Sequence, residues 1–201
     1  MVKFRTKEDV RKYVWKEIEK MAIPPFPVSG RIPNFRGSSK ACEKIRELEE
    51  YKKSKIVFSA PDSPLRRARE VVLKDNKILL AVKPRMTGFL ILDAKNTSAT
   101  IKEMLRSGKE IKENELYKLK KIDLFIQGCV AVDVRGYRIG KGSGYGDKEY
   151  ALLKKHGLID DCLYVVIAHD IQIFDDLSYL MEEHDVKADV ILTPSKVVWC
   201  K

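Results

Sequence analysis

Short runs of consecutive apolar residues recur along the chain, separated by turns or by segments with helical spacing. Strands of a parallel sheet that are buried on both faces have such unbroken runs, whereas half-exposed strands alternate polar and apolar residues. We therefore predict an α/β fold in which helices cover both faces of a mostly parallel sheet. We expect strands at 55–60, 78–82, 88–92, 124–134, 164–168 and 190–193. The 201 residues suit one large domain, and we expect a single α/β domain over 1–201.

Helical spacing is clearest near the N-terminus. Apolar residues recur every three or four positions over 10–21, Thr6 is placed to cap the helix, and acids follow it in the first turn. The prolines at 24, 25 and 27 end the pattern. We predict this helix over 6–22, and further helices over 38–51, 64–74 and 148–156.

The charge balance suits either an anionic partner or an ordinary solvated surface. Lys and Arg number 39 against 29 Asp and Glu, for a net charge of +10. A basic surface favours nucleotides, polyglutamates, nucleic acid or acidic membrane faces. The basic residues are interleaved with acids, as in 7–20, which is typical of an ion-paired surface. A nucleic-acid partner stays open as an alternative that no sequence motif supports.

The apolar segments are too short for a membrane protein. None approaches the ~20 residues that a membrane-spanning helix needs, and residues 1–10 have no apolar signal core. We expect a cytoplasmic protein without a membrane partner.

The four cysteines are scattered at 42, 129, 162 and 200. Their spacing forms no Cys-x-x-Cys pair and no Cys/His set of the kind that binds zinc. We interpret them as buried thiols, with a disulfide as the open alternative.

The segment RIGKGSGYGDKEY (138–150) lies between a predicted strand and a predicted helix. Its alternating Gly140, Gly142 and Gly144 lack a Cβ, so successive backbone N–H groups can turn toward one point. At the entrance of a helix, such a nest of amides binds phosphate groups. The segment therefore indicates an anion site, although a purely structural glycine turn remains the alternative.

Charged side chains in the same segment suit the polyphosphate of a nucleotide. Arg138 and Lys141 could reach β- and γ-phosphate oxygens, and Asp147 offers a carboxylate oxygen of the kind that Mg²⁺ prefers. Asp147 could instead serve only as a helix cap. The segment is neither a Walker A loop, which needs Gly-Lys-Ser/Thr, nor a Rossmann fingerprint, which reads GxGxxG.

From Asp133 through Arg138 to Asp147, the sequence resembles the signature of the 5-formyltetrahydrofolate cyclo-ligases (methenyltetrahydrofolate synthetases), whose loop reads roughly RLGxGxGYYD. The resemblance continues in the family's order over 7–193. Its further motifs are Lys7 with Arg11, Lys83-Pro84-Arg85, Gln172, and Glu183-His184-Asp185 followed by Asp189. One branch, the methenyltetrahydrofolate synthetase domain-containing proteins, is more similar still, through segments 31–38, 138–151 and 184–194.

The resemblance implies a NagB/RpiA/CoA-transferase-like α/β fold. It also implies an enzyme that uses ATP and Mg²⁺ to convert 5-formyltetrahydrofolate, or a related formylated pterin, to the 5,10-methenyl form. The family's nucleotide-binding residues correspond to Arg138, Gly140, Lys141, Gly142, Ser143, Gly144, Tyr145 and Gly146. Its metal ligands correspond to Asp147 and Asp185, and its catalytic residues to Lys7, Arg11, Lys141 and Tyr145.

The sequence departs from the family on the side of the loop that would meet the folate. Gly146 replaces a second tyrosine, and Lys148 replaces an arginine. Where the family has a glutamate near the end of the first strand, this chain has 61–64, with Asp62 as the available acid. A nucleotide site that serves another small substrate therefore stays open, as does a non-catalytic binding module.

Overall fold

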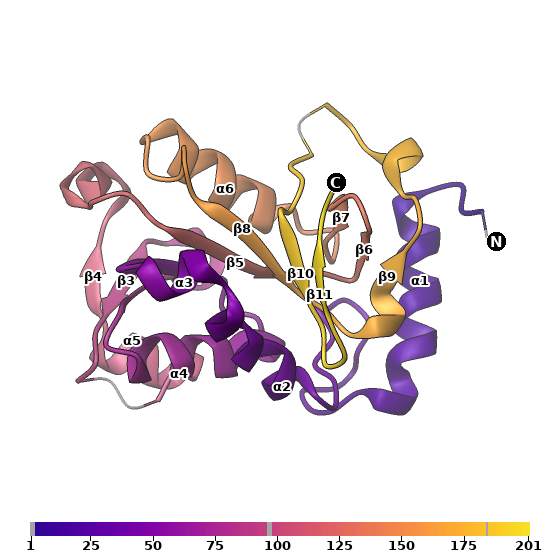
Figure 1. The fold of residues 1–201 in the computed structure, drawn as a ribbon, viewed down its shortest axis with the longest axis horizontal. Coiled ribbons are helices and arrows are strands. Elements are labelled where there is room, and N and C mark those ends of the chain that lie inside the picture. Colours follow the sequence, from indigo (N-terminus) through magenta and orange to yellow (C-terminus); the bar gives the residue numbers. More distant parts are fainter. Residues whose placement is uncertain (1–2, 96–97, 184) are drawn as a thin grey trace.

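The computed structural model describes residues 3–95, 98–183 and 185–201, and an eight-stranded sheet organises this part of the chain (Figure 1). The strand order is β11-β10-β8-β5-β1-β2-β3-β4. The strands are β1 (Ile56–Ser59), β2 (Ile78–Val82), β3 (Phe89–Leu92), β4 (Lys109–Ile111), β5 (Leu124–Gly128), β8 (Leu163–Ile167), β10 (Val190–Leu192) and β11 (Val197–Trp199).

The centre of the sheet is parallel and its edges are antiparallel. Strands β10, β8, β5, β1 and β2 run in the same direction. In contrast, β11, β3 and β4 each run antiparallel to a neighbour. The connection between β2 and β3 is residues 83–88, which is too short for the crossover that a parallel neighbour needs. The predicted mostly parallel α/β fold is thus confirmed.

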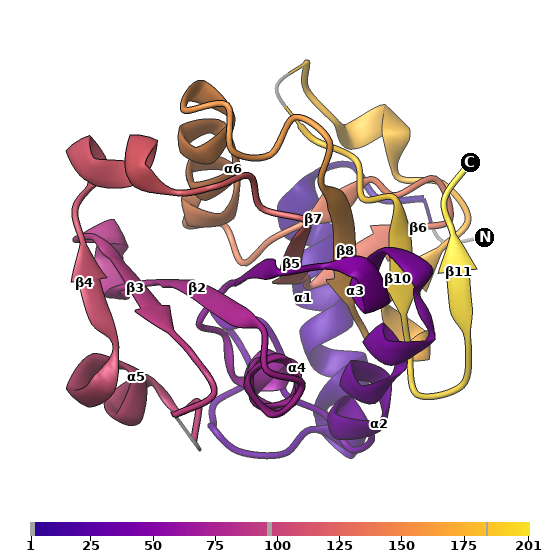
Figure 2. The ribbon, with the colours of Figure 1, turned by 60° about the vertical axis from the view of Figure 1, so that its left-hand side comes forward.

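Helices cover both faces of the sheet. Figures 1 and 2 show α4 (Arg66–Lys74) and α5 (Ile101–Ser107) on one side and α6 (Tyr145–Lys155) on the other. Every residue of β1 and β5 is buried, as the unbroken apolar runs predicted. No helix in the described ranges has the length and apolar character needed to cross a membrane.

Helix α1 (Lys7–Ile18) begins as the sequence predicted. The Thr6 hydroxyl accepts a hydrogen bond from the Asp9 amide at 3.1 Å, and the Asp9 carboxylate accepts one from the Thr6 amide at 3.0 Å. The helix ends at Ile18, and a 3₁₀ turn (Glu19–Met21) completes the predicted segment. Val10 and Val14 on its buried face belong to a small apolar cluster beside the main core. The other members of this cluster are Phe4, Ile32, Val130, Ala131, Ile139 and Leu177.

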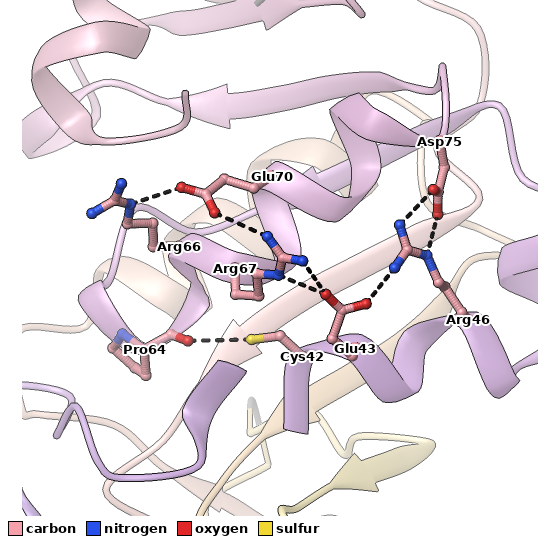
Figure 3. Close-up of polar contacts among 8 residues, drawn as sticks. All are labelled: Cys42, Glu43, Arg46, Pro64, Arg66, Arg67, Glu70 and Asp75. Atoms are coloured by element: carbon pink, nitrogen blue, oxygen red, sulfur yellow. Dashed lines mark hydrogen bonds and ion pairs between the residues drawn. The ribbon is translucent and has the colours of Figure 1, made fainter. Parts of the chain in front are cut away.

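The helix predicted over 38–51 divides into α2 (Ser38–Glu43), a 3₁₀ turn (Lys44–Glu47) and α3 (Glu49–Lys53). At the break, side chains of this segment bind Asp75, the residue that follows α4. Arg46 donates to both carboxylate oxygens of Asp75, at 2.6 and 2.8 Å, and the Tyr51 hydroxyl donates to Asp75 at 2.9 Å. Figure 3 shows the Arg46–Asp75 pair beside a second bridge, in which Glu43 joins Arg46 to Arg67 of α4. These contacts override the local helical pattern.

The single strand predicted over 124–134 is wrong. The chain leaves the large sheet after Gly128 and forms β6 (Ala131–Asp133) in a small sheet with β7 (Arg138–Ile139) and β9 (Ile173–Phe174). Gln172 donates to the Cys129 and Val130 carbonyls at 2.8 and 3.0 Å, so the backbone at the bend keeps hydrogen-bond partners. The bend directs β7 and the following loop over the carboxyl ends of the central strands.

Other differences concern short elements. Strands β4, β7, β9 and β11 and helix α5 were not predicted, because each is brief and carries little apolar periodicity. Helix α6 begins three positions earlier than predicted, at Tyr145. All four cysteines are free thiols, with Cys42 and Cys129 buried and the other two half-buried.

Candidate functional site

A cavity of about 430 Å³ opens at the carboxyl ends of β1, β2 and β5. This end of a parallel sheet is where α/β folds place their ligands. Its walls come from α1, from the segments that follow the three strands, and from the loop before α6. The lining includes Lys7, Arg11, Asp62, Lys83, Arg85, Gln127, Arg138 to Asp147, Glu149 and Asp185. The cavity thus collects every predicted site residue.

The glycine loop lies along the wall of this cavity. Gly142 and Gly144 adopt left-handed φ angles of 95° and 68°, which a residue with a side chain rarely adopts. A Cβ on Gly142 would also lie 3.4 Å from the Arg11 guanidinium carbon. Gly144 caps α6, so the free amides of the first helical turn begin inside the cavity wall. The predicted pairing of a glycine turn with a helix N-terminus is therefore present.

Arg138 is the most enclosed of the cationic side chains in the cavity. Its side chain is 6% exposed, and its Nη2 donates to the Asp147 carboxylate at 2.7 Å. Its Nη1 lies 3.4 Å from the Gly128 carbonyl, and its buried Nε has no hydrogen-bond partner. A buried guanidinium with one unused N–H is suited to receive an anion.

The three other candidate cations also touch polar groups across the cavity. Lys7 Nζ pairs with the Asp185 carboxylate at 2.6 Å. Arg11 Nε donates to the Gly140 carbonyl at 2.8 Å, which ties α1 to the glycine loop. Lys141 Nζ lies 3.1 Å from Asp62 Oδ1. These contacts join parts of the chain that are far apart in sequence, and they hold the cations at the cavity rim.

The two candidate metal ligands lie on this cavity without forming a preassembled metal site. Within the described ranges, no three acids, histidines or cysteines cluster in a way that could hold a metal ion. Asp147 pairs with Arg138, and Asp185 pairs with Lys7. Mg²⁺ is commonly held by one or two carboxylates together with substrate phosphates. The two aspartates fit that arrangement, in which the nucleotide supplies the remaining oxygens.

Glu149 is a cavity residue that the sequence did not predict. It lies on the buried face of α6, one turn before Leu153, and it is 4% exposed. Its Oε2 accepts a hydrogen bond from Gln127 Nε2 at 3.1 Å. Burial raises the pKa of Glu149 to about 8, and the Asp62 carboxylate adds to the shift. Its position one turn before the buried Leu153 was only a weak signal, because the sequence alone does not show what this helix face meets.

The sequence model of the 5-formyltetrahydrofolate cyclo-ligase family matches residues 4–194. The chain belongs to this family. The resemblance that the glycine loop indicated is thereby confirmed over nearly the full sequence.

The branch of the cyclo-ligase family that the sequence indicated is confirmed as well. Methenyltetrahydrofolate synthase domain-containing proteins of Homo sapiens and Danio rerio are 36% and 38% identical to the chain over 203 residues. Each match covers 96% of this chain and 53% of the relative. The chain therefore spans about half the length of these curated relatives.

Solved structures of cyclo-ligase family members share the fold. The 5,10-methenyltetrahydrofolate synthetase of Aquifex aeolicus has a TM-score of 0.63 at 23% identity, over 97% of this chain and 93% of that one. The enzyme of the same name from Mycoplasma pneumoniae has a TM-score of 0.56 at 18% identity, over 92% and 97% of the two chains. The expected fold is confirmed by both.

In this cyclo-ligase family member, Gly146 occupies a tight position. A Cβ at this position would lie 3.0 Å from both Arg138 Nη2 and Gln127 Nε2. Both of those side chains are buried and hydrogen-bonded, so a residue larger than glycine would require them to shift. The remaining Tyr145 is 38% exposed, and the ammonium of Lys148 lies 5.9 Å from its ring centre.

The other family motifs have different surroundings. Residues Lys83 to Met86 line the cavity, with Arg85 and Met86 in the left-handed region at φ 58° and 55°. Gln172 holds the bend after β5 instead of facing the cavity. Asp189 accepts a hydrogen bond from the Tyr164 amide at 2.7 Å, at the opposite end of the sheet. His184 lies outside the described residues.

Proposed function

We propose that the chain is an ATP- and Mg²⁺-dependent 5-formyltetrahydrofolate cyclo-ligase. The observation that carries the proposal is the single cavity in which Lys7, Arg11, Arg138 and Lys141 surround the glycine loop and the N-terminus of α6. This arrangement concentrates positive charge and backbone amides where a triphosphate would lie. Membership of the cyclo-ligase family supports the choice of substrate.

The proposed reaction has two steps. The formyl oxygen of 5-formyltetrahydrofolate attacks the γ-phosphorus of ATP, and ADP leaves. N10 of the folate then attacks the activated formyl carbon, loses its proton, and expels the oxygen as phosphate. The products are the 5,10-methenyl folate, ADP and phosphate. Because phosphoryl transfer depends on alignment and charge neutralisation, the protein's task is mainly to position the two substrates.

The residues of the cavity divide this task. Amides of residues 140 to 146 and the side chain of Arg138 would bind the phosphates, with the exposed Ser143 as an additional donor. Lys7 and Arg11 would close over them from α1, and Lys141 would neutralise the transferred group. Mg²⁺, held by Asp147 and Asp185 together with the nucleotide, would offset charge on the phosphates. Tyr145 would lie between the nucleotide and the pterin.

The polar contacts across the cavity suggest how the site exchanges partners. Lys141 would leave Asp62, and Lys7 would leave Asp185, when the triphosphate arrives. Asp185 would then be available to the metal, and Asp62 to the second substrate. The ion pairs thus keep the cations near their proposed positions until the triphosphate arrives.

A direct assay tests the proposal. Purified protein mixed with ATP, Mg²⁺ and 5-formyltetrahydrofolate is expected to produce the absorbance of the 5,10-methenyl product together with one phosphate per turnover. Reactions without ATP, and reactions with Lys141→Ala protein, are the controls. If neither the absorbance nor phosphate release exceeds the control without protein, the proposal is wrong.

The departures on the folate side favour one second candidate. Gly146 and the 61–64 segment change the part of the site that would face the folate, while the phosphate side keeps its cations. The same nucleotide site could therefore serve another small substrate. ATP hydrolysis that a different metabolite triggers, with 5-formyltetrahydrofolate inert, would favour this candidate.

Cytoplasmic location stays a prediction, which cell fractionation tests.

A further inference from the structure

The cavity contains a buried carboxyl group that the proposed phosphate chemistry does not use. Glu149 is 4% exposed and lines the cavity from α6. Its Oε2 accepts the hydrogen bond from Gln127, whereas its Oε1 has no hydrogen-bond partner and Glu149 forms no ion pair with any described residue. One oxygen of a buried acid is therefore left for a ligand.

Gln127 fixes the orientation of this carboxyl group. Its Nε2 donates to the Gly146 carbonyl at 3.0 Å as well as to Glu149, and its Oε1 accepts from the Tyr164 hydroxyl at 2.6 Å. The Gly146 carbonyl can only accept, so the amide cannot be reversed. Both ends of the Gln127 amide are engaged, so Gln127 itself has no group left to bind a ligand. Of the two side chains, Glu149 is the one that can bind it.

The fold alone gives no reason for an acid at this position. Burying a carboxyl group without a cationic partner is costly, and an apolar residue of similar size would pack on the sheet without that cost. The charged groups that influence Glu149 come from three other segments: Asp62 after β1, Arg138 in β7 and Lys141 in the glycine loop. Among the described residues, none of these three forms a hydrogen bond or ion pair with it. We interpret the acid as retained for binding.

The chemistry of a carboxyl oxygen limits what it binds. In its ionised form it repels phosphate oxygens, and the cations lie elsewhere on the cavity, so the triphosphate is expected against Lys7, Arg11 and Lys141. It accepts a hydrogen bond from an N–H group, whether the carboxyl is ionised or neutral. A planar nitrogen heterocycle with N–H groups along one edge fits this requirement.

We propose that Glu149, oriented by Gln127, is a specificity-determining residue that accepts a hydrogen bond from the N–H edge of the second substrate's heterocycle. The inference rests on the proposed function, which identifies that heterocycle as a reduced pterin. The pyrimidinone ring of a pterin carries a ring N–H and an amino group on one edge. Glu149 binds this edge while the opposite side of the ring system presents the formyl group to the nucleotide.

Calorimetric titration of the parent, Glu149→Gln and Glu17→Gln proteins tests the inference. Glu17 is an exposed glutamate of α1 and serves as the matched control. In Glu149→Gln, the amide oxygen keeps the bond from Gln127 and an NH₂ group replaces the free oxygen, so a donor faces a donor. We expect the affinity for 5-formyltetrahydrofolate to fall at least tenfold, with the affinity for Mg-ATP unchanged within twofold. Glu17→Gln is expected to match the parent for both ligands.

A ligand-side comparison identifies the contact. The 2-desamino analogue of 5-formyltetrahydrofolate is expected to bind the parent about tenfold more weakly than the natural compound, and to bind Glu149→Gln no more weakly than the natural compound does. If the parent does not distinguish the two compounds, the inference fails even when the variant is too unstable to study.

The outcomes separate this inference from the proposed function. Equal affinity of the parent and Glu149→Gln for 5-formyltetrahydrofolate, or an equal loss for 5-formyltetrahydrofolate and Mg-ATP, overturns the role of Glu149 alone. A parent protein that binds Mg-ATP but not 5-formyltetrahydrofolate overturns the proposed substrate and this inference together.

Discussion

Lys141 and Asp62 are 79 residues apart in the sequence, yet their side chains meet at 3.1 Å across the cavity. The contact joins the glycine loop to the segment that follows β1. Buried Arg69 holds that segment by donating to the Ala60 and Asp62 carbonyls at 2.7 and 3.1 Å. The lysine that we propose for the transferred phosphate is therefore held by an acid on a fixed backbone.

The first prediction concerns Asp62 itself. In Asp62→Asn, Lys141 is no longer shared with a carboxylate, so Mg-ATP is expected to bind more tightly. We expect a two- to fivefold gain, the size of a half-exposed ion pair worth about 0.4–1 kcal/mol. Calorimetric titration measures it. Weaker binding of Mg-ATP would show that Asp62 helps to hold the nucleotide or its metal.

Lys141→Ala is expected to affect turnover much more than stability. Removing a positive charge from the transferred group should lower kcat/KM roughly 100-fold. The free energy of unfolding should change by no more than about 0.5 kcal/mol, because the side chain is one-third exposed and only half-buried polar contacts are lost. Steady-state kinetics and urea denaturation test both parts. A large loss of stability with intact turnover would contradict the assigned role.

Asp147→Asn is expected to weaken nucleotide binding only when the metal is present. The affinity for ATP should fall at least tenfold with Mg²⁺ and change little in EDTA, because the carboxylate would ligate the metal. The protein should also lose about 1 kcal/mol of stability, since Arg138 would keep a weaker, neutral partner. Asp160→Asn, an exposed acid beyond α6, is the matched control. An equal loss with and without Mg²⁺ would assign Asp147 to the support of Arg138 instead.

The Arg46–Asp75 bridge predicts a pH dependence of stability outside the cavity (Figure 3). Hydrogen bonds from Arg46, with a further one from Tyr51, hold the pKa of Asp75 below its ordinary value of 3.8. A lowered pKa in the folded state stabilises the protein above the unfolded pKa, and this stabilisation is lost as the pH falls through the folded value. Asp75→Asn should therefore cost about 1–2 kcal/mol at pH 7.

The cost of Asp75→Asn should shrink as the pH falls below about 4, where the carboxylate takes up a proton in the unfolded chain, and should vanish below the lower pKa of the folded state. Urea denaturation of both proteins across this range measures the difference. A difference between parent and variant that stays constant from pH 7 down to pH 2.5 would contradict the assignment.

The sequence predicted the parts of the fold that depend on local patterns. The apolar runs at β1, β2, β5, β8 and β10 gave the parallel centre, because strands buried on both faces tolerate few polar residues. Thr6 and Asp9 marked the start of α1 correctly, since a capping box is formed within four residues. The glycines at 140, 142 and 144 located the cavity wall, because their alternating spacing is also a local pattern.

Features that depend on distant residues were not predictable. The bend after Gly128 rests on Gln172, and the break after α2 rests on the reach of Arg46 to Asp75. In the sequence, Glu149 is one more charged residue of a predicted helix, because only the folded chain shows that its face meets Gln127. Lys141 and Asp62 likewise lie in distant segments, which come together only when the sheet forms.

A crystal structure with Mg²⁺ and a non-hydrolysable ATP analogue tests the central proposal most directly. We expect the triphosphate to lie against residues 138–146, with the metal on Asp147 and with Lys141 turned from Asp62 to the γ-phosphate. A glycine loop that stays empty while the nucleotide binds elsewhere, or does not bind at all, would contradict the account.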